Sequence, residues 1–303
     1  MLITFTTTQP NIPLKIKDLE RIGKLEVLKG VYNKSAKTKD ILSRTEILLA
    51  NPKYFGVIDR KVISLFKNLK YLFLMSSGFD WVDIDYAKSR NIIVGGARGT
   101  TSISVAEHAW ALALTLAKSL QNVTTNSAGV INTQIHGKTV GIFGYGYVGK
   151  AIANIAQGFG AEVCYTSSHR LKDLRNRRFL NKDELLRKSD IIFLCLPLTK
   201  DTRNYLSSGE IELLKKNAIL INTAREDLVE NKPLFKALKT GRLFGYGIDT
   251  DKRNSTFLKK NRQLRIVSTF HAAYRTAEAL EAIYSDTAKD VEAFIKGKPL
   301  SIL

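Results

Sequence analysis

The sequence has few cysteines and no pattern that predicts a metal site. Its 303 residues include two cysteines, Cys164 and Cys195. They do not form the closely spaced pair that is typical of zinc or redox sites. Both lie in apolar, strand-like segments, so we interpret them as reduced residues of the core.

No segment of the sequence predicts a membrane span or a secretion signal. The most apolar helical stretch, residues 105–120, is too short for a bilayer and contains Glu107, His108 and Lys118. Residues 1–5 are mostly apolar but lack both the basic start and the long apolar core of a signal peptide. We therefore expect a cytoplasmic protein without membrane contact.

Acidic residues are scarce relative to basic ones. The chain has 47 Lys and Arg against 28 Asp and Glu, a formal net charge of +19, which makes nucleic acid a partner to consider. The basic residues are spread along the chain, with short clusters at residues 170–178 and 252–265 that lack interleaved aromatic residues. We therefore do not expect nucleic acid to be the main partner. An anionic cofactor and an anionic substrate would also profit from a positive field, so the charge discriminates only weakly between these partners.

Short β-rich segments alternate with helical segments along the whole chain, without solenoid repeats or low-complexity tracts. Strands are predicted in the first part at residues 2–6, 25–31, 46–50, 71–75 and 92–94. After an apolar helix at residues 102–120, six more strands are predicted at residues 138–143, 162–166, 191–196, 218–222, 245–249 and 266–269. A terminal helix at about residues 276–296 follows.

This alternation predicts an α/β protein with two doubly wound parallel-sheet domains. The second series has the strand count of a Rossmann dinucleotide-binding domain, and the first suits a flavodoxin-like substrate domain. The terminal helix can return the chain to the first domain. We therefore expect a discontinuous substrate domain of residues 1–98 and 280–303, and a cofactor domain of residues 99–279.

A phosphate-binding turn is predicted directly after the first strand of the second series. The spacing G-x-G-x-x-G is formed by Gly144, Gly146 and Gly149. These glycines permit a tight turn, close approach of a pyrophosphate and close helix packing. A helix is predicted at residues 150–159, and the amides of Tyr147 and Val148 at its start would meet the diphosphate charge.

The next strand, which ends at Thr166, predicts the form of the cofactor. An NAD-binding domain usually presents an acidic residue to the adenosine ribose at this place. Here the chain has Ser167, Ser168, His169 and Arg170 instead, which offer hydroxyl and cationic groups to a 2′-phosphate. We therefore favour NADP(H) over NAD(H), with NAD bound without the acidic contact as the alternative.

The chain resembles the D-isomer-specific 2-hydroxyacid dehydrogenase family over nearly its whole length. Six segments are similar to the family motifs S-A-G-x-D-x-I-D, V-A-E-H, P-L-T-x-x-T, N-x-x-R-G-x-x-V, L-D-V and P-H, in this order. The matching segments are residues 76–85, 105–108, 196–202, 221–229, 247–249 and 269–271. One such match would be weak, but six in the right order are specific.

The resemblance implies a division of roles among the matching residues. Arg225 would bind the substrate carboxylate and carbonyl oxygen, and His271 would donate a proton to the developing alkoxide. Backbone amides near Ser77 and Gly78 would hold the carboxylate as well. Asp249 matches the family aspartate beside the nicotinamide carboxamide.

Further cofactor contacts are implied for Pro197 and Thr202 of the P-L-T-x-x-T segment. The resemblance implies reversible reduction of a small 2-oxoacid to the D-hydroxyacid in a homodimer. Glyoxylate or hydroxypyruvate is favoured, and the choice between glyoxylate, hydroxypyruvate and phosphoglycerate stays open. Candidates for contact with the substrate side chain are Phe79, Arg98 and Tyr274.

The sequence departs from the family where His271 should have an acidic partner. The family usually has a glutamate five residues after the aspartate, whereas this chain has Asn254. An amide orients an imidazole but does not stabilise its charged form as a carboxylate does, and Asp251 is a possible substitute. Formate dehydrogenases of the family also carry an amide there. Formate oxidation, and a cofactor-sensing corepressor-like protein with little turnover, therefore stay open as alternatives.

Overall fold

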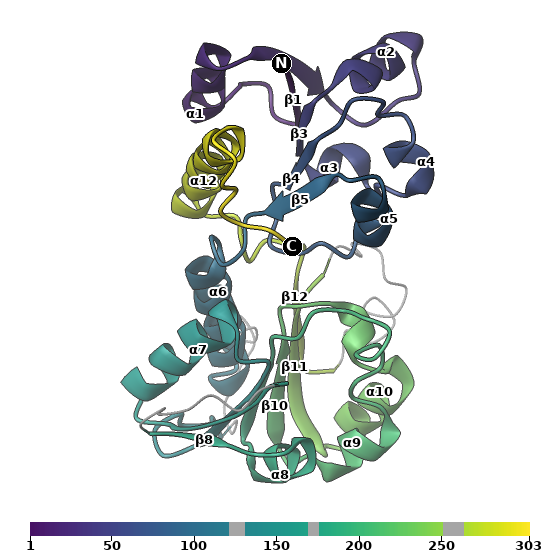
Figure 1. The fold of residues 1–303 in the computed structure, drawn as a ribbon. Helices are drawn as coiled ribbons and strands as arrows, with labels where there is room; N and C mark the ends of the chain where they lie inside the picture. Colours follow the sequence, from purple (N-terminus) through teal and green to yellow (C-terminus); the bar gives the residue numbers. More distant parts are fainter. Residues whose placement is uncertain (121–130, 169–175, 251–263) are drawn as a thin grey trace. The chain divides into compact units, whose positions relative to one another are not determined.

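The computed structural model describes residues 1–120, 131–168, 176–250 and 264–303. The chain forms two compact units (Figure 1). The first contains Met1–Thr101 and Thr276–Leu303, and the second contains Ser102–Arg275. Both sheets are entirely parallel, so the prediction of two doubly wound α/β domains is confirmed.

The first unit is built on a five-stranded sheet with the order β2-β1-β3-β4-β5, which is the flavodoxin-like order. Its strands are β1 (Leu2–Thr7), β2 (Lys24–Lys29), β3 (Ile47–Ala50), β4 (Tyr71–Leu74) and β5 (Ile93–Gly96). Its helices are α1 (Leu14–Lys17), η1 (Asp18–Arg21), α2 (Ala36–Arg44), α3 (Pro52–Phe55), α4 (Arg60–Ile63), α5 (Ile84–Ser89) and α12 (Ala277–Ile295). In Figure 1, α1 and α12 lie on one side of this sheet and α2, α4 and α5 on the other.

The central strands of this unit are apolar because both faces of the sheet are covered. Every residue of β3 and β4 is buried, as expected for a parallel sheet between helical layers. Helix α2 begins after Ser35, whose Oγ accepts a hydrogen bond from Thr38 N at 3.2 Å. Such caps satisfy an amide that has no partner within the helix.

A buried polar contact fastens the terminal helix to the first sheet. Tyr71 Oη, on β4, donates to Asp290 Oδ1 of α12 at 2.7 Å, and Leu300 N donates to the same oxygen at 3.1 Å. The Tyr71 ring also stacks on Phe294 with centroids 4.3 Å apart. Burial, followed by the bond to Asp290, raises the pKa of Tyr71. The end of the chain therefore belongs to the same packed unit as its beginning.

The second unit is built on a seven-stranded sheet with the order β12-β11-β10-β9-β6-β7-β8. This is the Rossmann order with one further strand at an edge. The strands are β6 (Thr139–Phe143), β7 (Glu162–Thr166), β8 (Arg177–Phe179), β9 (Ile191–Leu194), β10 (Ala218–Asn222), β11 (Leu243–Asp249) and β12 (Ile266–Thr269). The predicted count of six strands is one too low, because the sequence did not predict β8. The three residues of this strand, Arg-Arg-Phe, contain no apolar run.

Helices cover both faces of this second sheet. They are α6 (Ser102–Ala117), α7 (Tyr147–Gly158), α8 (Lys182–Lys188), α9 (Ser208–Leu213), η3 (Glu226–Leu228) and α10 (Asn231–Lys239). In Figure 1, α6 and α7 lie on one side, and α8, α9 and α10 on the other. An apolar core fills each side of the sheet.

Two helix boundaries differ from their predictions, and the second of them lies at the glycine turn. Helix α6 ends at Ala117 rather than near residue 120. Helix α7 begins at Tyr147 rather than at Lys150, with Gly146 as its N-cap. Tyr147 and Val148 therefore lie in the first turn of the helix, where backbone N–H groups have no partner within the helix.

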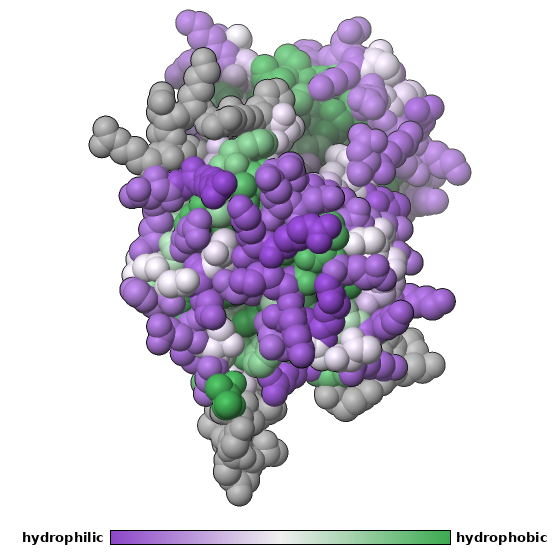
Figure 2. All heavy atoms as spheres, turned by 90° about the horizontal axis from the view of Figure 1, so that it is seen from below, coloured by the Kyte–Doolittle hydropathy of each residue, from purple (hydrophilic) through white to green (hydrophobic). Residues whose placement is uncertain are grey.

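The outer surface is polar where it can be seen. Figure 2, which views the molecule from below relative to Figure 1, shows a mostly hydrophilic face with separate apolar patches. Among the described residues, every helix is too short or too polar to span a membrane.

Candidate active site

The candidate site residues of the second unit lie where its strands end. All seven strands are parallel, so their carboxyl ends share one edge of the sheet. The order of the strands reverses between β6 and β9, which is where such sheets bind ligands. The residues at or just beyond this edge are Gly144 after β6, Cys195 after β9, Arg225 after β10, Asp249 at the end of β11 and His271 after β12.

The glycine turn after β6 is closely packed on the protein side. Gly144 has a φ of +93°, and a Cβ there would lie 2.6 Å from the carbonyl oxygen of Cys195. A Cβ on Gly149 would overlap the carbonyl oxygen of Gly144. A side chain at either position would therefore collide with backbone atoms of the protein.

Gly146 differs from the other two glycines because it faces open space. No atom lies within 4 Å of the position that its Cβ would take. Helix α7 begins here without a side-chain cap and without an acidic residue in its first turn. Uncapped N–H groups at a helix start favour an anion, so the turn fits the pyrophosphate of a dinucleotide.

The loop after β7 has hydroxyl side chains at its start. Ser167 and Ser168 follow the end of the strand, and neither is acidic. Thr166, the last residue of β7, accepts a hydrogen bond from Gly144 N at 2.9 Å through its carbonyl oxygen. This bond places the loop next to the glycine turn, while Arg170 lies outside the described residues.

The loop after β9 is closed by its own hydroxyl groups. Thr202 Oγ1 donates to Pro197 O at 2.6 Å and accepts from Thr199 N at 2.7 Å. The hydroxyl proton of Thr202 is therefore used within the loop. The predicted cofactor contacts of Pro197 and Thr202 remain predictions.

Arg225 lies in a loop whose backbone is held by a buried amide. Asn222, the last residue of β10, is fully buried. Its Nδ2 donates to Arg225 O at 2.8 Å and its Oδ1 accepts from Ala224 N at 3.1 Å. Arg225 Nη1 donates to Ala224 O at 2.9 Å. The Asn222 side chain thus holds the backbone of the loop at Ala224 and Arg225.

His271 lies in a short loop whose backbone amides donate hydrogen bonds to Asp249. Asp249 Oδ1 accepts from Ala272 N at 2.9 Å, and its Oδ2 accepts from Ala273 N at 3.0 Å. Asp249 is only 6% exposed, and both of its carboxylate oxygens accept hydrogen bonds from this loop. Its predicted contact with the nicotinamide carboxamide remains a prediction. The predicted partners of His271, Asp251 and Asn254, lie outside the described residues.

In the first unit, the loop after β4 contains the predicted carboxylate-binding residues. Ser77 Oγ donates to Ala97 O at 3.0 Å and lies 3.1 Å from Thr101 Oγ1. Trp81 Nε1 donates to Gly78 O at 2.9 Å. The predicted binding of a carboxylate by the backbone amides near Ser77 and Gly78 remains a prediction.

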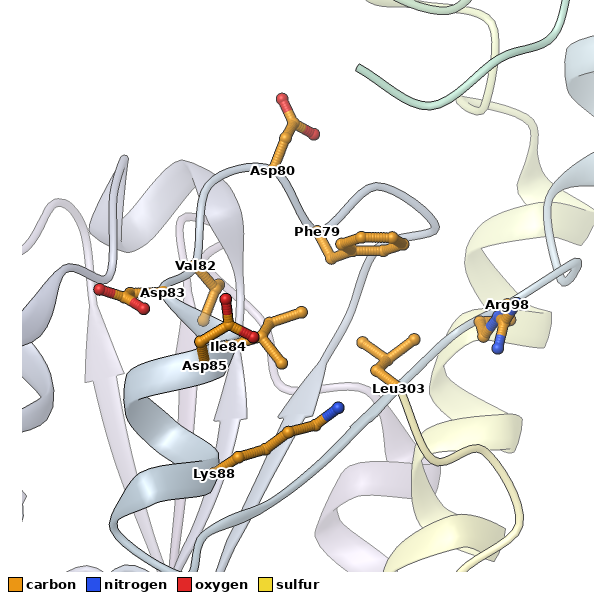
Figure 3. Close-up of a pocket in the computed structure, with 9 residues that line it drawn as sticks. All are labelled: Phe79, Asp80, Val82, Asp83, Ile84, Asp85, Lys88, Arg98 and Leu303. Carbon is orange, nitrogen blue, oxygen red and sulfur yellow. The ribbon is translucent and has the colours of Figure 1, made fainter. Parts of the chain in front are cut away.

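A cavity of about 410 Å³ lies beside this loop. Figure 3 shows the ring of Phe79 and the side chains of Ile84 and Leu303 at its apolar part, with Lys88 and Arg98 near Leu303. In the described part of the chain, neither of these two cations has an ion-pair partner. Two of the three predicted side-chain contacts, Phe79 and Arg98, therefore line one cavity.

The third predicted contact, Tyr274, lies in the second unit beside His271. The two rings meet edge to face with centroids 5.7 Å apart.

The cysteine at the sheet edge is not a reactive thiol. Burial raises the pKa of the Cys195 thiol to about 12 and that of Cys164 to about 11. Both thiols are protonated at neutral pH and are weak nucleophiles. The described residues contain no group of His, Cys, Asp and Glu side chains suited to a metal ion.

Comparison with known proteins shows the family to which the chain belongs. The model of the D-isomer specific 2-hydroxyacid dehydrogenase NAD binding domain matches residues 105–272. The glyoxylate reductase of Thermococcus litoralis is 31% identical over 80% of this chain and 78% of its own length. The chain belongs to the D-isomer-specific 2-hydroxyacid dehydrogenase family. It is therefore an oxidoreductase that uses a nicotinamide cofactor.

Two solved structures illustrate the range of similar proteins. The acyclic imino acid reductase Bsp5, in complex with NADPH and D-Arg, has a TM-score of 0.89 and 27% identity, with full coverage of both chains. The NAD-dependent formate dehydrogenase of Staphylococcus aureus, in complex with NAD, has a TM-score of 0.83 and 25% identity. Here 100% of this chain and 99% of that one are covered.

Within this 2-hydroxyacid dehydrogenase, sequence reasoning missed the residues that hold the site in place. The sequence gives His108 no catalytic role, yet its Nε2 lies 2.9 Å from Thr269 Oγ1 beside the His271 loop. Ser104, which had no assigned role, donates through Oγ to Ala273 O at 2.6 Å. The available signal was that Ser104 and His108 are four residues apart, and so share one face of a helix.

Proposed function

We propose that the chain transfers hydride between a reduced nicotinamide cofactor and a small 2-oxoacid, with formation of the D-2-hydroxyacid. Glyoxylate and hydroxypyruvate are the favoured substrates. One observation carries the proposal: Arg225 and His271 follow β10 and β12 at the sheet edge where the glycine turn follows β6. The similarity to a glyoxylate reductase supports the substrate class.

The cofactor supplies the hydride, and the protein supplies orientation and charge. Arg225 presents a planar fork of N–H donors, which binds the substrate carboxylate and polarises the ketone oxygen as negative charge develops there. His271 donates a proton to that oxygen and accepts it back in the oxidative direction. Ser77 and Gly78 are proposed to contribute backbone amides to the carboxylate, and Phe79, Arg98 and Tyr274 are the candidates for contact with the substrate side chain.

NADP(H) is proposed as the preferred cofactor. The loop after β7 offers the hydroxyls of Ser167 and Ser168 and no acidic side chain, and an acidic group there would repel a 2′-phosphate. Arg170 is proposed to pair with that phosphate. Gly144, Gly146 and Gly149 form the turn beneath the pyrophosphate, with the amides of Tyr147 and Val148 at the helix start.

The test is the initial rate of NADPH and NADH oxidation with a panel of 2-oxoacids that includes glyoxylate and hydroxypyruvate. A second arm supplies formate with NADP+ or NAD+, because a formate dehydrogenase is among the similar structures. Reduction of a 2-oxoacid with a lower KM for NADPH than for NADH is the expected result.

Each alternative has its own outcome in this test. Formate oxidation without 2-oxoacid reduction would replace the proposed reaction with the formate-type one. A shift of the melting temperature by NADPH, with no turnover in either arm, would indicate a cofactor-sensing binding protein. A lower KM for NADH would contradict the proposed role of the loop after β7.

We further propose that the chain forms a homodimer, as the family resemblance implies. The expected result in light scattering after gel filtration is twice the chain mass of 33.9 kDa. A mass of one chain across the micromolar range would contradict the proposal.

A further inference from the structure

We propose that one face of helix α6, formed by Ser104 and His108, positions His271 for proton transfer. This inference rests on the proposed function, because it gives His271 the role of proton donor. It concerns two residues that do not touch the reacting atoms and act through the loop of residues 269–273. We call this loop the histidine loop.

The two side chains of α6 hold opposite ends of the histidine loop. His108 Nε2 lies 2.9 Å from the hydroxyl of Thr269, at the start of the loop. Ser104 Oγ donates to the carbonyl oxygen of Ala273, at its end, at 2.6 Å. Residues four apart lie on the same face of a helix, so one rigid surface contacts both ends of the loop.

Asp249 also binds the histidine loop, and together with Ser104 and His108 it forms what we call the clamp. Its Oδ1 accepts from Thr269 Oγ1 at 2.7 Å and from Ala272 N at 2.9 Å, and its Oδ2 accepts from Ala273 N at 3.0 Å. The clamp is thus made of Ser104 and His108 from α6 and Asp249 from β11. His271 lies in the middle of the segment that they hold.

The hydrogen bonds determine which nitrogen of His108 bears the proton. A threonine hydroxyl has one proton, and Thr269 gives it to the Asp249 carboxylate. Thr269 can therefore only accept a hydrogen bond from His108. In the neutral imidazole the proton must then lie on Nε2, and Nδ1 is without a proton.

The histidine loop has a conformation that needs external support. His271 has a φ of +46°, in the left-handed region that residues with a Cβ rarely adopt. Such backbone persists where surrounding contacts over-determine it, often at functional sites. The clamp supplies those contacts on both sides of His271, and a displaced general acid transfers its proton less well.

The test compares two matched pairs of variants, with kcat, KM and melting temperature measured for each. His108→Leu removes the donor, whereas His108→Gln keeps an N–H near the position of Nε2. Thr269→Val removes the hydroxyl, whereas Thr269→Ser keeps it. We expect His108→Leu and Thr269→Val to lower kcat by on the order of tenfold to a hundredfold, with KM for the cofactor unchanged. The conservative partners should retain most of kcat.

Equal kcat values for His108→Leu and the parent would overturn the inference, as would equal losses in His108→Leu and His108→Gln. Loss of kcat only in proportion to the unfolded fraction would assign a merely structural role to the bond.

A second measurement does not depend on turnover. The chain has four histidines, so their ring signals in ¹⁵N-edited NMR can be assigned by substituting one histidine at a time. The expected spectrum of the parent shows the Nε2–H form of His108 and a His271 signal that shifts in His108→Leu but not in His108→Gln. An Nδ1–H form of His108, or a His271 signal insensitive to His108→Leu, would contradict the clamp.

Failure of the proposed function is a different outcome. A parent protein that reduces no 2-oxoacid would overturn the catalytic role of His271, while the NMR result would still decide whether α6 positions its loop.

Discussion

Replacement of Arg225 with alanine is expected to lower kcat/KM for 2-oxoacid reduction by on the order of 10²–10³-fold, the usual effect of removing a donor to a developing oxyanion. Arg225→Lys should recover little of this loss. An ammonium group is a compact charge without the planar fork that contacts a carboxylate and a carbonyl oxygen together. The side chain should therefore matter by its shape as well as by its charge.

The structure predicts that these variants remain folded. The Arg225 carbonyl oxygen accepts hydrogen bonds from Asn222 Nδ2 at 2.8 Å and from Leu228 N at 3.2 Å. Both bonds involve only the backbone of Arg225, so they survive the substitution. Steady-state kinetics and thermal unfolding check the prediction together. A kcat/KM close to that of the parent, or a KM for NADPH that rises as much as kcat/KM falls, would contradict the substrate role.

Two glycines of the same turn should give opposite results when each is changed to alanine. Gly149→Ala is expected to destabilise the protein by about 3 kcal/mol or more, because overpacking of this kind costs on the order of 1–3 kcal/mol and here the added methyl meets rigid backbone. The new Cβ would overlap the carbonyl oxygen of Gly144. Without movement of the turn or of α7, this overlap cannot be relieved.

Gly146→Ala should leave stability nearly unchanged and weaken cofactor binding. A Cβ at Gly146 meets no protein atom within 4 Å, and the φ of −81° is normal for alanine. The methyl would instead occupy the space at the start of α7 that we propose for the pyrophosphate. Thermal unfolding and titration with NADPH, carried out on both variants, check the pair. Equal cofactor affinity in Gly146→Ala and the parent would place the pyrophosphate elsewhere.

The fold was predictable because its signals are local. The apolar segments of β3, β4, β9 and β10 are buried on both faces of their sheets, which is why they read as short continuous hydrophobic runs. β8 carries no such signal, since its residues Arg177–Phe179 form an edge strand that is only partly buried. Its pairing with β7 is decided by the neighbouring strand rather than by its own composition.

The start of α7 shows where a local reading is displaced by a few residues. The helical pattern suggested a start at Lys150, but the helix begins at Tyr147 because the glycine turn feeds directly into it. This difference matters for function, because it moves the uncapped amides of the first turn next to Gly146.

The sequence by itself determined the two parallel α/β sheets and the glycine turn, because periodicity and motif spacing are properties of neighbouring residues, and its resemblance to the family implied Arg225 and His271 as candidates. Only the tertiary structure decided how these residues are held. Asn222 beneath Arg225 and the clamp around His271 depend on side chains that meet across the fold. His108 and Thr269 are 161 residues apart, and nothing in their local sequence specifies that they share a hydrogen bond. Packing of α6 against the sheet brings them together.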